Sequence, residues 1–108
     1  MNFKAYSDAW LEAVNDKDTI KMAENLSDEF IWFNDRYDWN MDKSGTIEWC
    51  IETNFTASDF TCLYENNEVI VGTHNVVEPD APDSSVLFIA KIKDNHIISH
   101  QYLREFER

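Results

Sequence analysis

The sequence predicts an α+β fold in which one curved sheet lies against a layer of helices. Apolar residues recur at helical spacing through most of the first half of the chain, which one short apolar and aromatic segment interrupts. Four long segments rich in β-branched residues, separated by turn residues, fill the second half. The order helix, helix, strand, helix and then a four-strand meander is typical of α+β proteins. With 108 residues, the chain has the length of a single domain, residues 1–108.

Three helices are predicted in the first half of the chain. In each of them the apolar residues fall three or four positions apart and form one apolar face. In chain order, these faces are Phe3, Tyr6, Trp10, Ala13 and Val14; Ile20, Ala23 and Leu26; and Ile47, Cys50, Ile51 and Phe55. Asp18 is expected to cap the second helix and Ser44-Gly45 the third, because these residue types satisfy the free N–H groups of a first turn. The polar residues 27–29 are expected to end the second helix.

Five strands are predicted. Residues 30–33 are apolar on both faces, which indicates a strand that is covered on both sides. The meander is expected to use the segments 60–64, 68–77, 86–93 and 96–106, joined by turns rich in Asn, Asp and Pro. Residues 34–43 are polar with scattered rings and have no regular period, so they are predicted to form a loop.

Charge and composition exclude several classes of partner. Nine Lys and Arg against 21 Asp and Glu give a net charge of −12, which repels phosphate backbones and anionic lipids. We therefore expect neither a nucleic acid nor a membrane partner. The N-terminus lacks the apolar core of a secretory signal, which favours a cytoplasmic protein. Cys50 and Cys62 have no metal-ligand spacing and are expected to be buried, and we predict no metal site and no cofactor.

Four short segments mark the predicted elements. They are 10–18 (WLEAVNDKD), 26–32 (LSDEFIW), 44–47 (SGTI) and 94–99 (DNHIIS). In this order the chain resembles the NTF2-like superfamily, in particular its SnoaL-like and ketosteroid-isomerase-like members. The resemblance implies a cone-shaped fold, with three N-terminal helices packed on a strongly curved, mostly antiparallel sheet. It also implies an apolar pocket in the open end of the cone and a homodimer formed through the outer face of the sheet.

The isomerase branch implies a Tyr on the first helix, a protonated acid on a meander strand and a carboxylate base after the first strand. Trp10 stands at the Tyr position and Phe88, or its neighbour Leu87, at the acid position. Both side-chain donors of that oxyanion hole are therefore replaced. The position of the base falls on either Asn34 or Asp35, and the sequence leaves open which of them faces the cavity.

A set of acid and base residues remains. Asp35 is a candidate general base if it faces a dry cavity, because burial raises the pKa of a carboxyl group; the alternative is that it begins a solvated loop. His100 and Tyr102 share one face of their strand, which is either the pocket face or the outer face. Dehydratases and cyclases that resemble this chain place His, Asp and Tyr in their cones. Asp35, His74, His100 and Tyr102 therefore form the candidate catalytic set.

Rings make up 14% of the chain, and some of them are expected to line a cavity for a flat or apolar ligand. The candidate ligand-binding residues are Tyr6, Trp10, Trp32, Trp49 and Phe88. The sequence thus predicts an NTF2-like protein that binds a small apolar or aromatic molecule. Cofactor-free isomerase, dehydratase or cyclase chemistry is the enzymatic hypothesis. A non-catalytic, dimeric interaction or adaptor domain is the alternative.

Overall fold

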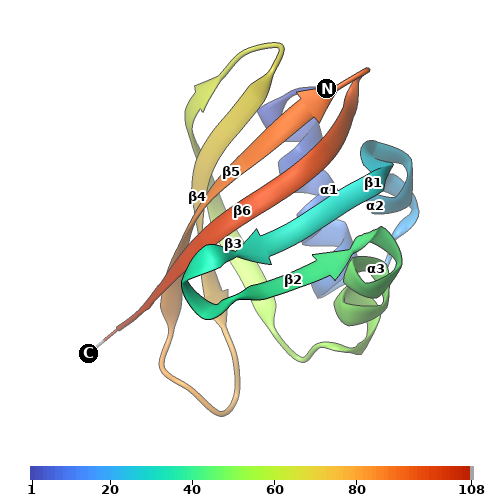
Figure 1. Ribbon diagram of the computed structural model, residues 1–108. Helices are drawn as coiled ribbons and strands as arrows, with labels where there is room; N and C mark the ends of the chain where they lie inside the picture. Colours follow the sequence, from blue (N-terminus) through green and yellow to red (C-terminus); the bar gives the residue numbers. More distant parts are fainter. Residues whose placement is uncertain (108) are drawn as a thin grey trace.

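The computed structural model describes residues 1–107 and contains three α-helices on one face of a six-stranded sheet (Figure 1). The elements are α1 (Phe3–Asn15), α2 (Ile20–Asn25), β1 (Leu26–Asn34), the 3₁₀-helix η1 (Asp35–Tyr37), β2 (Trp39–Asp42), α3 (Lys43–Glu52), β3 (Thr56–Glu65), β4 (Val69–Val77), β5 (Ser84–Lys93) and β6 (His96–Phe106). The predicted α+β class, with helices packed on a curved and mostly antiparallel sheet, is confirmed.

The strands lie in the order β2-β1-β6-β5-β4-β3, and only β1 and β6 run parallel. The pairing of β1 with β6 joins the first half of the chain to the last strand. Irregular register between β3 and β4 bends this end of the sheet, and Asp59 takes a positive φ of 57° at the irregularity. The bend lets the sheet curve around α1 (Figure 1).

Helix α1 forms the centre of the core. It begins where the Asn2 side chain accepts a hydrogen bond from the N–H of Ala5. Its apolar face is buried as the spacing predicts, and Tyr6, Ala9 and Ala13 have no exposed surface. Among residues 1–107, no helix has both the length and the apolar character that crossing a membrane requires.

The prediction of a loop at residues 34–43 is wrong. After Asn34 the chain reverses through η1 and Asp38, whose φ is 50°, and Trp39–Asp42 then pairs with β1 as strand β2. A four-residue strand has too few positions to show a period. The pairing edge of β1, rather than the local pattern, determines its conformation.

Several predicted boundaries and caps also differ. Helix α2 ends at Asn25, so residues 27–29 belong to β1, and β3 begins at Thr56 rather than at residue 60. The cap of α3 is Asp42, whose carboxylate accepts from the N–H of Gly45 at 2.8 Å. The N-cap of α2 is Thr19 rather than the predicted Asp18, although the Asp18 carboxylate accepts a hydrogen bond from the N–H of Ile20 at 3.2 Å.

The two cysteines have different environments. Cys50 is buried in α3, as predicted, and burial raises the pKa of its thiol to about 12. Cys62 is exposed, so the prediction that both are buried is wrong for this residue. It lies on β3, which is the last strand in the sheet order and has an exposed outer side.

Candidate functional site

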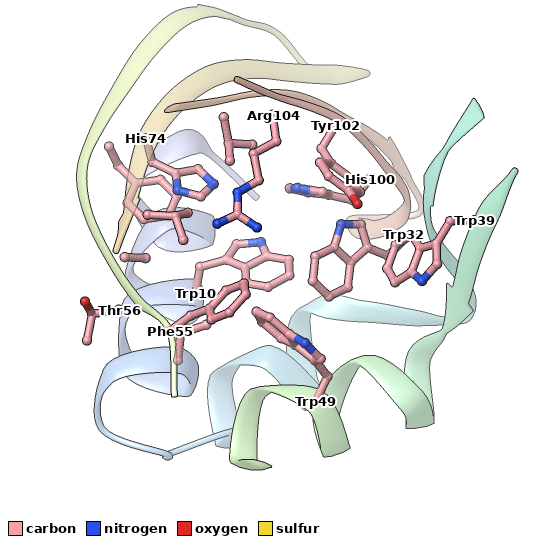
Figure 2. A pocket seen from close by; sticks show the side chains of 15 residues that line it. Trp10, Trp32, Trp39, Trp49, Phe55, Thr56, His74, His100, Tyr102 and Arg104 are labelled. Atoms are coloured by element: carbon pink, nitrogen blue, oxygen red, sulfur yellow. The ribbon is translucent and has the colours of Figure 1, made fainter. Parts of the chain in front are cut away.

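A cavity of about 250 Å³ lies between α1, α3 and the inner face of the sheet (Figure 2). Most of its walls are rings and aliphatic side chains. The lining residues are Trp10, Val14, Trp32, Trp39, Trp49, Phe55, Thr56, Ala57, Phe60, His74, Val76, Val86, His100, Tyr102 and Arg104.

Strand alternation brings the polar lining residues together. His100, Tyr102 and Arg104 occupy alternate positions of β6, so all three side chains face the cavity. Val86 of β5 is the register partner of both His74 and Arg104, which places these two side chains in one row across three strands. The face that His100 and Tyr102 share is therefore the pocket face.

A wall of indole rings adjoins these polar side chains, and Trp32 of β1 is the register partner of His100. Trp32 makes edge-on contacts with Trp10, Trp39 and Trp49, with ring centroids 4.9 to 5.3 Å apart. These four rings come from four different elements, so packing among them fixes the shape of the wall. Three of them were predicted to line the pocket. Trp39 was not, because its segment was expected to be a loop.

Two predicted ligand-binding residues lie beneath the pocket instead. Tyr6 and Phe88 are completely buried and do not line the cavity. The Phe88 ring stacks on His100 with centroids 4.9 Å apart. Helical spacing predicted Tyr6, and the family resemblance predicted Phe88, but neither gave the depth of the side chain. Both residues support the pocket from below.

The structure does not bring Asp35 to the pocket. Asp35 is exposed as the first residue of η1, while Asn34 is buried and its side chain accepts from the N–H of Arg36. The alternative, in which Asp35 begins a solvated segment, describes what is found. The residues of 1–107 that line the pocket include no Asp or Glu.

Comparison with solved structures identifies the fold. The chain is similar to a candidate ketosteroid isomerase from Kribbella flavida, with a TM-score of 0.80, 8% identity and coverage of 98% of this chain and 79% of the other. It is also similar to an NTF2-like protein from Cytophaga hutchinsonii, with a TM-score of 0.76, 8% identity and coverage of 97% of this chain and 91% of the other. An LEH-like epoxide hydrolase from M. tuberculosis is similar with a TM-score of 0.69, 12% identity and coverage of 95% of this chain and 81% of the other. The chain has the NTF2-like fold. No family model matches the sequence, and no curated protein does.

Within this NTF2-like pocket, His100 is held in one protonation state. Its Nδ1 lies 2.7 Å from the Tyr6 hydroxyl in a buried hydrogen bond. Burial lowers the pKa of His100 to about 3, so the imidazole is neutral, and burial raises the pKa of Tyr6. A buried phenol that does not donate its proton leaves a donor without an acceptor, which costs free energy. We therefore assign the proton of Tyr6 to the bond with Nδ1, which leaves Nε2 of His100 carrying an N–H.

His74 has the opposite tautomer. Its Nδ1 lies 3.3 Å from the carbonyl oxygen of Asn75, which can only accept, so Nδ1 carries the proton. Burial, with a smaller contribution from the neighbouring Arg104, lowers the pKa of His74 to about 4. Its ring stacks on Phe60 with centroids 4.4 Å apart. Nε2 of His74 is therefore an acceptor, across the pocket from the donor of His100 (Figure 2).

Two indole N–H groups have no partner. Nε1 of Trp10 and Nε1 of Trp32 are buried and make no hydrogen bond with any of residues 1–107. Figure 2 shows both nitrogens on the ring edges that face the polar side chains of β6. A buried donor without an acceptor costs about 1–3 kcal/mol. The pocket thus contains more donors than it satisfies.

Arg104 was not predicted as a pocket residue, although its position in the sequence indicates the pocket face. It lies two positions after Tyr102, so the period of two that paired His100 with Tyr102 also places Arg104 on this face. Burial raises the pKa of the Tyr102 phenol, and the neighbouring Asn34 and Arg104 oppose this. The missed residue is the only Lys or Arg among the described residues that line the pocket.

The two buried imidazoles predict how stability depends on pH. Their folded pKa values of about 4 and about 3 lie below the value of about 6.5 for an unfolded histidine, so the unfolded state binds more protons between these limits. The free energy of unfolding is therefore highest above about pH 6.5 and falls as the pH drops toward 4. Urea denaturation at pH 8, 6 and 5 measures this fall.

His74→Phe should make the fall shallower. Phenylalanine keeps the stacking on Phe60 but cannot bind a proton, so one of the two contributions disappears. The difference between variant and wild type at pH 8 measures the packing effect alone. Identical slopes for the two proteins would contradict the assignment of a neutral, buried His74.

Proposed function

We propose that the pocket binds a small, flat, largely apolar molecule that carries a hydrogen-bond acceptor. The observation that carries this proposal is the combination of indole walls with unsatisfied donors at Trp10 and Trp32. A cavity of about 250 Å³ fits one or two fused rings. Among the solved structures of this fold are proteins named as a candidate ketosteroid isomerase and an epoxide hydrolase, which supports a small-molecule site.

Filling the cavity should abolish binding. Val76 lines the pocket and is buried, so Val76→Phe places a ring in the space that the ligand would occupy. We expect 2-naphthamide, a neutral two-ring amide, to bind the wild type and to bind Val76→Phe at least tenfold more weakly. Isothermal titration calorimetry measures both affinities.

The matched control is the next residue of the same strand. Val77 is 44% exposed on the other face of β4, so Val77→Phe adds the same ring outside the cavity and should leave the affinity unchanged. Melting temperatures of both variants test whether the fold is kept. Equal affinities in Val76→Phe and Val77→Phe would exclude this cavity as the binding site.

Proton transfer on the bound molecule is a second candidate function, and the opposite tautomers of the two histidines favour it. Nε2 of His74 accepts a proton from a carbon beside a carbonyl, and the electron pair of that C–H bond moves to the carbonyl oxygen. The donors of His100 and Trp10 would stabilise the charge that develops there. The proton then returns to carbon, so the reaction needs no cofactor.

This chemistry can be followed without knowing the natural substrate. We expect the protein to accelerate deuterium exchange at the α-carbon of 1-indanone in D₂O, measured by proton NMR. His74→Phe should lose at least tenfold of the accelerated rate while retaining affinity for 2-naphthamide. A variant that exchanges as fast as the wild type would exclude His74 as the base.

We propose, in line with the family resemblance, that two copies pair through the outer face of the sheet. On that face Leu87 of β5 and Leu103 of β6 are register partners and are 38% and 51% exposed. Ile89 extends the same apolar surface and is 37% exposed. Covering these side chains would remove apolar area from water.

Light scattering after size-exclusion chromatography tests the pairing. We expect a dimer for the wild type and a monomer for Leu103→Glu, because a carboxylate at a self-complementary face meets its own copy. Ile20 of α2 lies away from the sheet and is 68% exposed, so Ile20→Glu makes the same kind of change outside the proposed interface and serves as the control. A monomeric wild type would contradict the dimer and favour the adaptor alternative, in which this face binds another protein.

A further inference from the structure

We infer that the ligand of this pocket is an organic anion, with a carboxylate or a comparably charged planar group held by Arg104. The inference rests on the proposed binding function and names the chemical class of the ligand. Arg104 contributes the only formal positive charge among the described lining residues, and those residues include no Asp or Glu.

The guanidinium is positioned by neighbours that leave part of it free. Its Nε donates to the Ser84 hydroxyl at 2.7 Å. The rings of Phe55 and Phe106 lie against it, with their centroids 5.0 and 4.4 Å from the central carbon. The side chain is only 18% exposed, so most of its charge is withdrawn from water. These contacts orient the planar group without using its terminal nitrogens.

The terminal nitrogen Nη2 is not satisfied. It is buried and makes no hydrogen bond with residues 1–107. The nearby Glu78 carboxylate lies 3.5 Å away, longer than the about 2.7–2.9 Å of a charge-assisted hydrogen bond. Glu78 therefore offsets the charge of Arg104 but does not occupy its donors. A planar anion that approaches the edge of the guanidinium can form the two parallel bonds that Arg prefers.

The other polar groups favour the same ligand charge. Nε1 of Trp10 and Nε1 of Trp32 offer donors without acceptors, and His100 offers an N–H at Nε2. A cationic ligand would face Arg104 without a lining carboxylate to compensate, and a neutral ligand would leave part of the guanidinium unpaired. An aryl carboxylate would place its ring on the indole wall and its charge at Arg104.

Glu78 and the ligand would both interact with the positive charge of Arg104, so removing Arg104 or Glu78 changes anion binding in opposite directions. Arg104→Gln removes the charge that holds the anion. Glu78→Gln removes the neighbouring negative charge, which repels an anion, and leaves Arg104 in place. A residue that only stabilised the fold would not weaken anion binding in one variant and strengthen it in the other.

The test compares two probes of the same shape. 2-Naphthoate and 2-naphthamide share a two-ring body and an acceptor oxygen, and at pH 7.5 only the first is charged. By isothermal titration calorimetry, we expect the wild type to bind 2-naphthoate at least tenfold more tightly than 2-naphthamide. Arg104→Gln should remove this preference, and Glu78→Gln should increase it severalfold.

The controls carry the same change of net charge at exposed positions. Lys4→Gln matches Arg104→Gln, and Glu105→Gln on β6 matches Glu78→Gln. Neither control should alter the preference. If Arg104→Gln fails to fold, the wild type and Glu78→Gln still decide the question.

Each remaining outcome overturns a defined part of the proposal. Equal binding of the two probes by the wild type would exclude an anion receptor but leave the pocket as a site for neutral molecules. Preference for the anion that persists in Arg104→Gln would exclude Arg104 as the anchor. Failure of both probes to bind would overturn the proposed binding function together with this inference.

Discussion

The hydrogen bond between the Tyr6 hydroxyl and Nδ1 of His100 connects the central helix to the last strand, 94 residues away in sequence. It is buried, so its loss would leave polar groups without water or a partner. The bond also determines which hydrogen-bonding group His100 offers to the pocket, because it fixes the tautomer of His100 and leaves an N–H at Nε2. Phe88 stacks on the same imidazole and restricts its orientation. One contact between core residues thus sets both the position of α1 on the sheet and the chemistry of the site.

Sequence periodicity could predict the parts of this molecule in which a local pattern repeats. The spacing of three and four residues located α1 and its buried face, and the spacing of two put His100 and Tyr102 on one side of β6. The same spacing extends to Arg104, which also lines the cavity. Periodicity tells which way a side chain faces. It does not tell how deep the side chain lies, and for this reason Tyr6 and Phe88 were expected to touch the ligand.

The features that could not be predicted depend on contacts between distant segments. Strand β2 forms because β1 offers a pairing edge, and nothing within Trp39–Asp42 requires it. The choice between Asn34 and Asp35 depended on where β1 ends and the chain turns into η1. With Asn34 buried and Asp35 exposed, the expected carboxylate base is absent from the described pocket lining. In the proposed proton transfer, the acid and base roles would therefore fall to the two neutral histidines, whose tautomers follow from the hydrogen bond that each makes through Nδ1.

The electrostatics of the pocket differ from those of the protein as a whole. A net charge of −12 repels anions at long range, but salt screens this field over about 8 Å under physiological conditions. Inside the cavity the dielectric is lower, and interactions with fixed donors are stronger than in water. Selection of an anion would therefore depend on Arg104 and the indole N–H groups at close range, not on attraction from a distance.

Polar groups that lack a partner within the protein carry an energetic cost in the folded state. Two indole N–H groups and one guanidinium nitrogen are buried without acceptors, and Glu78 lies too far from Arg104 to remove the last of these deficits. Molecules that satisfy the donors bind the folded chain but not the unfolded one, so they also stabilise it. The aromatic wall and the donors then act together in ligand binding. The rings give the site apolar surroundings, and in such surroundings a donor without a partner favours a ligand that can accept from it.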